Sequence, residues 1–301
     1  MSRFNPTPAQ GERLKADLTL LAVAAIWGTG FVTCRLALDY LGPFLYNGLR
    51  FSLAALTLLP LAWNSLRTVT GSQWRGAAVA GLLIFSASGI QQMGMQHTTA
   101  GKAGFITGLY VVLVPILLAL GWRRRASWPI WAASVLAAAG LFFLSVTRPL
   151  TLGPGDGLVL VSALFWALHV IAIGQLARQI DILPLAVIQY AVCGLLSLVV
   201  GLLFEIDTAA SLSTVWWVVL YNGIVSVAIG YTLQVVGQRS APTADAAVLL
   251  SMEAVFAALF GGLFLGEMLA PRQLVGCGLM LAGMLLAQAQ ALVPARAKAP
   301  T

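Results

Sequence analysis

The chain carries very little charge. Its 301 residues include 17 Lys and Arg and 10 Asp and Glu, so that 9% of the side chains are charged, whereas an ordinary soluble domain has about 25%. Hydrophobic residues make up 59% of the sequence, and the mean hydropathy is +0.91. A soluble fold needs more polar surface than this, and a disordered segment needs far fewer apolar residues. The composition therefore predicts an integral membrane protein.

Cysteine is also scarce. The chain has three cysteines, Cys34, Cys193 and Cys277, and each lies within an apolar run, which argues against a disulfide scaffold. The net charge of +7 has a membrane explanation, because Lys and Arg accumulate on the cytoplasmic side of membrane proteins. We therefore expect no nucleic-acid partner.

Apolar runs of membrane-spanning length follow one another along the sequence. A transmembrane helix needs about 20 mainly apolar residues. The fold class predicted is an all-α integral membrane protein with ten transmembrane helices. The expected spans are 17–38, 43–63, 74–96, 102–122, 127–147, 156–177, 183–204, 214–237, 243–264 and 271–292.

Basic residues are distributed unevenly over the two sides of these spans, and this asymmetry predicts the orientation. One side collects Arg3, Arg13, Lys15, Arg67, Arg75, Arg123, Arg124, Arg125, Arg178, Arg239, Arg296 and Lys298, and the other collects Arg35, Lys102, Arg148 and Arg272. The side richer in Lys and Arg is normally cytoplasmic. We expect both termini in the cytoplasm.

The two halves of the chain resemble each other. Asp17 and Trp27 are matched at one common offset by Asp156 and Trp166, and Pro43 and Gly89 are matched at a nearly equal offset by Pro184 and Gly230. We expect a first five-helix repeat at 17–147, a linker at 148–155 and a second repeat at 156–292. Because five is odd, the second repeat is inverted relative to the first. Inverted repeats suit alternating access, although a duplication retained only for packing would leave the same pattern.

Two short stretches carry a family resemblance. These are Ala25-Ile26-Trp27-Gly28-Thr29-Gly30-Phe31, and Met252-Glu253-Ala254-Val255-Phe256-Ala257-Ala258-Leu259 leading to Gly266-Glu267. With the order of the spans, they resemble the EamA-type drug/metabolite transporters over about residues 17–292. The resemblance implies a bacterial inner-membrane metabolite exporter with a central cavity between spans 1–4 and 6–9. Within the family the chain is similar to the YddG-type amino-acid exporters.

Two charged residues lie far from the end of any span, Arg50 and Glu253. Charged side chains inside a membrane are costly and usually mark a cavity or a pathway. Arg50 is suited to bind a substrate carboxylate through two hydrogen bonds, and Glu253 to meet an ammonium group or carry a proton. The alternatives are an ion pair between the two, or extension of the Arg50 side chain toward the outer surface.

Polar and aromatic residues in other spans complete the predicted substrate site. They share an intramembrane position, where a polar group lines a cavity or satisfies a neighbouring helix. The predicted substrate-binding residues, besides Arg50 and Glu253, are Trp27, Tyr46, Asn47, Gln92, Gln96, Trp166, His169, Gln189, Tyr231 and Gln234.

These features predict a secondary transporter that exports small amphipathic metabolites, with aromatic or neutral amino acids as the expected cargo. Its partners would be a small-molecule substrate and the lipid bilayer, and the chain would be a monomer or a weak homodimer. No nucleotide-binding loop or metal motif is present in the sequence, so we expect no cofactor and no catalytic residues. Export of cationic drugs by proton antiport, an intramembrane enzyme and a channel are the alternatives. The driving force stays open.

Overall fold

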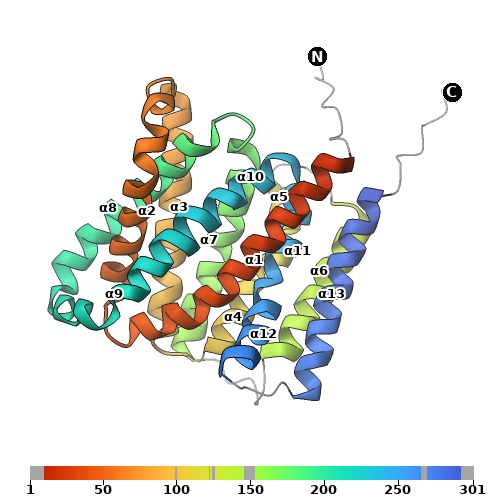
Figure 1. Cartoon of the computed structure of the whole chain (residues 1–301). Coiled ribbons are helices and arrows are strands. Elements are labelled where there is room, and N and C mark those ends of the chain that lie inside the picture. The colour runs from red at the N-terminus through yellow and green to blue at the C-terminus, as the bar shows by residue number, and fades with distance from the viewer. Residues whose placement is uncertain are drawn as a thin grey trace.

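The computed structural model describes residues 10–98, 100–121, 123, 126–145, 153–265 and 270–292, and this part of the chain is almost entirely helical. Figure 1 shows the helices crossing one elongated bundle. In chain order they are α1 (Gln10–Leu38), α2 (Pro43–Leu66), α3 (Gly71–Met95), α4 (Ala100–Gly108), α5 (Tyr110–Gly121), α6 (Trp128–Ser145), α7 (Pro154–Leu176), α8 (Ile182–Phe204), η1 (Ile206–Ser211), α9 (Leu212–Tyr221), η2 (Asn222–Tyr231), α10 (Thr232–Ser240), α11 (Thr243–Ser251), α12 (Glu253–Leu265) and α13 (Pro271–Leu292).

Some of the sequence predictions fall outside the described residues. Most of the predicted linker 148–155 does, and so does Gly266-Glu267 of the second motif. The same holds for part of the charge pattern, namely Arg3, Arg124, Arg125, Arg148, Arg296 and Lys298.

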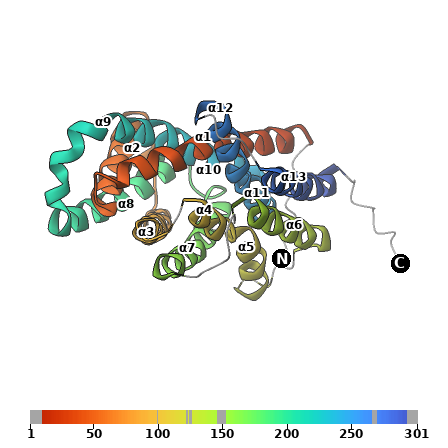
Figure 2. The same cartoon turned by 90° about the horizontal axis from the view of Figure 1, so that it is seen from below.

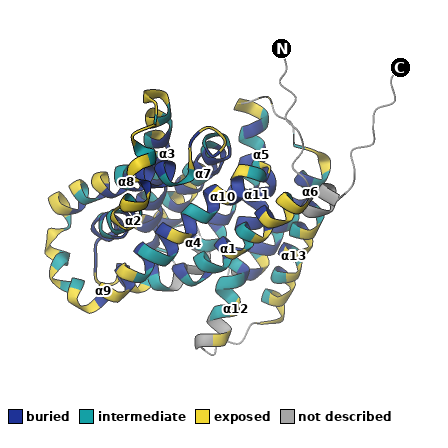
Figure 3. Cartoon of the chain, turned by 45° about the horizontal axis from the view of Figure 1, so that its top comes forward, coloured by how far each residue is buried: buried dark blue, intermediate teal, exposed yellow. Residues whose placement is uncertain are grey.

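All ten predicted spans are found as helical segments, and the predicted fold class is confirmed. Eight of the described helical segments are long and apolar enough to cross a membrane, and Trp128–Leu144 and Pro271–Ala287 are shorter apolar helices. Large apolar side chains such as Leu195, Phe204 and Leu263 lie exposed on the outside of the bundle, as Figure 3 shows in yellow along the outer helices. Lipid contact explains this surface, because a soluble protein would bury most of it.

Three of the ten predicted spans are not continuous α-helices. The fourth breaks at Leu109 between α4 and α5, and the ninth breaks at Met252 between α11 and α12. The eighth contains the ten-residue π-helix η2 between α9 and α10. Hydropathy is uniform across these positions, which is why the sequence indicated unbroken helices there. Such interruptions inside a membrane are found where the backbone lines a cavity or is buried in protein.

Local signals set several helix ends. Thr70 accepts a hydrogen bond from the backbone N–H of Gln73, and the Gln73 side chain accepts one from the backbone N–H of Thr70, which forms a capping box at the start of α3. Helices α2 and α7 begin at Pro43 and Pro154, where a missing N–H costs nothing.

Helices of one half pack on helices of the other half. The most extensive contacts join α2 to α8, α3 to α7 and α6 to α13, and α1 lies along η2 and α10. In each of the first three pairs, glycines allow close approach: a Cβ on Gly194 would lie 2.7 Å from the Ser52 nitrogen, and one on Gly94 would lie 2.8 Å from the Gly155 oxygen. The two repeats therefore interlock and do not form separate domains.

Helices α6 and α13, the two spans that the family resemblance leaves outside the cavity, lie together at one side of the bundle. Figures 1 and 2 show them at the edge opposite α8. A Cβ on Gly276 would lie 2.7 Å from the Gly140 oxygen, and a Cβ on Gly140 would lie 2.6 Å from the Gly276 oxygen. These small residues therefore form a close contact between α13 and α6.

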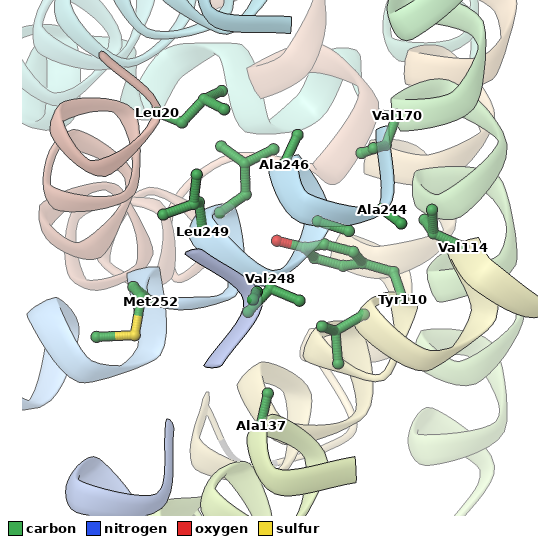
Figure 4. Close-up of a cluster of buried hydrophobic side chains, with 14 of the residues drawn as sticks. Leu20, Tyr110, Val114, Ala137, Val170, Ala244, Ala246, Val248, Leu249 and Met252 are labelled. Atoms are coloured by element: carbon green, nitrogen blue, oxygen red, sulfur yellow. The ribbon is translucent and has the colours of Figure 1, made fainter. Parts of the chain in front are cut away.

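Helix α1 begins and α13 ends at the same end of the bundle, which we call the terminal end (Figure 1). Residues of α1, α5, α7 and α11 belong to a large apolar cluster that also includes residues of α6, α12 and α13. Figure 4 shows Leu20 and Leu249 on one side of this cluster and Val114 and Val170 on the other.

Candidate functional site

A cavity lies at the centre of the bundle. About 690 Å³ of space between atoms lies within and in front of it, including open solvent at its mouth. Its lining combines charged, amide and aromatic side chains from both halves of the chain: Trp27, Gly30, Cys34, Arg50, Gln91, Gln92, Met95, Thr107, Tyr110, Trp166, His169, Val170, Ser226, Tyr231, Gln234, Leu250 and Glu253.

The apolar cluster of Figure 4 adjoins this cavity. Tyr110 and Val170 belong to both the cluster and the cavity wall. The lining also reaches Cys34 and Met95, close to the C-terminal ends of α1 and α3. The cavity lining thus extends from this cluster toward the end of the bundle opposite the terminal end.

The lining follows the internal repeat. Trp27 is matched by Trp166, and Gly30 by His169, at the same offset along the chain, and all four line the cavity. The helix breaks at Leu109 and Met252 are separated by nearly this offset. Paired broken helices at equivalent positions of inverted repeats are typical of substrate sites in secondary transporters.

Arg50 on α2 is the cation of the cavity. Its side chain is 7% exposed, and its Nε donates to Asn47 Oδ1 at 2.9 Å. The guanidinium carbon lies 5.0 Å from the ring centre of Tyr46 and 4.9 Å from that of Phe51, within the range of cation–π attraction. Among the described residues no carboxylate lies within 4.0 Å of Arg50.

Glu253 is the anion of the cavity and the first residue of α12. Within the described part of the chain it forms no hydrogen bond and no ion pair, although it is 8% exposed. Backbone N–H groups at a helix start favour a negative charge. The ion pair between Arg50 and Glu253 that the sequence left open is not formed here, so the guanidinium and the carboxyl group both line the cavity without contacting each other.

Aromatic rings form the middle of the wall. The ring centre of Tyr231, the last residue of η2, lies 4.6 Å from that of Trp27 and 6.1 Å from that of Trp166. Trp27 Nε1 donates to the Ser226 carbonyl at 3.1 Å, whereas Trp166 Nε1 is buried without a partner. This wall gives a substrate an apolar contact surface with few fixed hydrogen bonds.

His169 is held by an amide. Its Nε2 lies 3.1 Å from Gln189 Oε1, and since the amide oxygen can only accept, Nε2 is the donor. Gln189 is fully buried behind His169 and does not line the cavity. Gln234, which lines the cavity, donates to Gln238 Oε1 at 3.0 Å. The His169–Gln189 bond joins α7 to α8, whereas the Gln234–Gln238 bond lies within α10, so only the first satisfies a neighbouring helix.

The structure brings most of the predicted site residues together. Eight of the twelve line the cavity, namely Trp27, Arg50, Gln92, Trp166, His169, Tyr231, Gln234 and Glu253. Tyr46 and Asn47 do not line the cavity but contact Arg50, which does. Gln189 contacts His169 in the same way. Gln96 is exposed at the C-terminal end of α3 and does not line the cavity. Substrate binding by any of these residues stays a prediction.

Sequence reasoning missed nine lining residues: Gly30, Cys34, Gln91, Met95, Thr107, Tyr110, Val170, Ser226 and Leu250. Gln91 donates to Thr107 at 2.8 Å, and this adjacent pair could have been found from two polar residues in neighbouring apolar spans. Tyr110 could have been found by aligning the repeats, because it is equivalent to Glu253. Among the described residues, no group of three or more His, Cys, Asp or Glu side chains is arranged to hold a metal ion.

Comparison with known proteins gives the family. The EamA-like transporter family model matches this chain twice, over residues 14–146 and 153–288. The chain belongs to the EamA-like transporter family. Its internal repeat is therefore the duplication of this family's unit, and the chain is a multi-pass membrane protein of a transporter family.

Individual relatives are also named as transporters. An uncharacterized transporter of Archaeoglobus fulgidus is 34% identical over 279 residues, which cover 91% of this chain and 86% of the relative. The threonine/homoserine exporter RhtA of Escherichia coli is 32% identical over 182 residues, 56% of this chain and 57% of RhtA. A crystal structure with 19% identity and a TM-score of 0.75 covers 93% of this chain and 99% of its own, and it supports the fold alone.

Proposed function

We propose that this EamA-like protein is a secondary transporter that exports small amino acids by alternating access. The observation that carries the proposal is the pair Arg50 and Glu253, which line one central cavity without pairing with each other. Burying two separate charges without partners is costly. A zwitterionic substrate offsets this cost at both positions, with its carboxylate at Arg50 and its ammonium group at Glu253.

Alternating access is supported by the symmetry of the wall. The cavity is lined by equivalent residues of the two inverted repeats, Trp27 with Trp166 and Gly30 with His169. When the two repeats exchange conformations, the same cavity opens to the other side of the membrane. We place the protein in a bacterial inner membrane with both termini in the cytoplasm.

The relative RhtA supports amino acids as the substrate class, since its name states that it exports threonine and homoserine. The cavity wall combines aromatic rings with amide groups. A substrate with a short side chain can contact both. The aromatic or neutral side chains expected from the sequence are tested within the same panel of substrates.

The test is transport by purified protein in liposomes loaded with labelled amino acids. We expect protein-dependent efflux of at least one neutral amino acid above that of empty vesicles. Absence of flux over all twenty amino acids would overturn the proposal. Flux of cationic drugs alone, driven by an imposed pH gradient, would replace amino-acid export by drug–proton antiport.

A further inference from the structure

Arg50 is surrounded by neutral groups. Asn47 Oδ1 accepts from Arg50 Nε at 2.9 Å. With the Gln92 amide oriented to satisfy its neighbours, Gln92 Oε1 accepts from an Arg50 terminal nitrogen at 3.0 Å, and Gln92 Nε2 donates to Asn47 Oδ1 at 3.2 Å. The three side chains thus form a closed triangle of hydrogen bonds between α2 and α3.

Neutral partners are unusual for a buried arginine. Buried charges are commonly paired with an opposite charge, because removal from water is otherwise expensive. Here Asn47 is 0% exposed and Gln92 is 1% exposed, and the rings of Tyr46 and Phe51 cover the guanidinium. These groups orient Arg50 and compensate part of its desolvation, but they leave its positive charge in place.

We propose that the Asn47–Gln92 amide pair sets the net charge of the transported substrate. The inference rests on the proposed amino-acid transport. Because the amides are neutral, the cavity holds one cation and one anion, Arg50 and Glu253, and selects a substrate with no net charge but with a carboxylate. Asn47 does not line the cavity, so that it acts as a positioning residue through Arg50.

The substitution Asn47→Asp tests this directly. It keeps the size and the acceptor oxygen of the side chain but adds a negative charge at 2.9 Å from Arg50 Nε. The new carboxylate pairs with Arg50 and competes with the substrate carboxylate. The cavity then carries a net negative charge from Glu253 and favours an amine without a carboxylate. Gln92→Glu places a carboxylate on the same guanidinium from α3.

The experiment measures binding and liposome flux for matched pairs of an amino acid and its decarboxylated amine. Suitable pairs are threonine with 1-aminopropan-2-ol, leucine with 3-methylbutylamine and phenylalanine with phenethylamine. For the wild type we expect the amino acid to bind about tenfold or more tightly than its amine. For Asn47→Asp and Gln92→Glu we expect the amino-acid affinity to fall at least about tenfold and the order to reverse, since a carboxylate contact of this kind is worth a factor of ten or more.

A matched control is available for each substitution. Asn64 on α2 and Gln179 just after α7 are exposed, so Asn64→Asp and Gln179→Glu make the same chemical changes away from the cavity. We expect both to keep the wild-type preference. Gel filtration and thermal unfolding of all four variants verify folding. If Asn47→Asp does not fold, the selectivity of Gln92→Glu tests the inference.

The outcomes separate this inference from the proposed function. Wild-type amino-acid transport with unchanged selectivity in folded Asn47→Asp and Gln92→Glu overturns the inference and leaves the proposed function standing. Loss of amine and amino acid alike in folded variants also overturns it, because charge then does not explain the effect. A wild type that neither binds nor transports any amino acid overturns both.

Discussion

Tyr110 and Glu253 are equivalent residues of the two repeats, and each begins the second half of a broken helix. Tyr110 is the first residue of α5 and Glu253 the first residue of α12, and both line the cavity. The backbone around the cavity thus follows the repeat, but its charge does not, since a phenol stands where the other repeat has a carboxylate. Under the proposed function, this difference places the ammonium group of a zwitterionic substrate at Glu253.

Replacing Glu253 by Gln should therefore weaken amino-acid binding while preserving the fold. The change keeps the size of the side chain and removes the charge that meets the substrate ammonium. We expect the dissociation constant to rise about 10- to 100-fold, as for loss of a hydrogen bond to a charged group. Titration calorimetry on purified protein measures this constant, with Glu12→Gln at the exposed start of α1 as the control.

A different result would give Glu253 another role. If the affinity is unchanged but transport no longer responds to an imposed pH gradient to which the wild type responds, Glu253 carries a proton. Unchanged affinity and unchanged response would exclude both roles.

The number and the class of the helices could be predicted because they depend on composition and segment length alone. The two central charges could also be predicted, since Arg50 and Glu253 stand out against uniformly apolar spans. The helix breaks could not. Neither break falls on a proline or a glycine, since the interrupted positions are Leu109 and Met252. The proline of the fourth span, Pro115, lies inside α5. The break there follows Gly108, whose added Cβ would lie 2.6 Å from Leu141, a tertiary contact that a local pattern does not contain.

Which residues near Arg50 line the cavity also could not be predicted without the structure. Tyr46, Asn47 and Arg50 share a helix face in the sequence, so all three were predicted to bind substrate. Helix α3 packs so that Gln92 donates a hydrogen bond to Asn47. Of these four residues, Arg50 and Gln92 line the cavity, and Tyr46 and Asn47 do not. Gln96, one turn beyond Gln92, lies past the last residue of α3 and is exposed. Which member of a polar stripe reaches a cavity depends on where the neighbouring helix ends.

Replacing Arg50 by Ala should abolish binding of carboxylate substrates. The guanidinium is the described cation of the cavity, and Lys in its place keeps the charge but loses the planar pair of donors. We expect amino-acid flux in liposomes to fall at least about 100-fold in Arg50→Ala and less in Arg50→Lys, with Arg75→Ala, an exposed site, unchanged. Equal flux in all three variants would show that Arg50 only supports packing.

The contact between α6 and α13 should tolerate no side chain at Gly276. A Cβ there would lie 2.6 Å from the Leu144 nitrogen and 2.7 Å from the Gly140 oxygen, whereas a Cβ on Gly278 of the same helix meets nothing within 4 Å. We expect Gly276→Ala to destabilise the protein by about 1–3 kcal/mol, as overpacking does, and Gly278→Ala to be neutral. Thermal unfolding in detergent compares the two, and equal midpoints would contradict the close contact.

Arg13 at the terminal end should be more important for stability than either of its acidic partners. Its guanidinium bonds to Asp245 of α11 and lies 3.8 Å from Asp17 of α1, and Asp17 and Asp245 are 8% and 6% exposed. One cation therefore holds two buried carboxylates, so Arg13→Ala leaves two like charges without a partner.

We expect Arg13→Ala to cost about 3–5 kcal/mol, as for breaking a buried ion pair. Asp17→Asn should cost little, because it leaves Arg13 and Asp245 as a balanced pair, and it should recover part of the loss when combined with Arg13→Ala. A double-mutant cycle by thermal unfolding measures this coupling. Additive effects of the two substitutions would mean that Arg13 and Asp17 do not interact, and that Arg13 stabilises Asp245 alone.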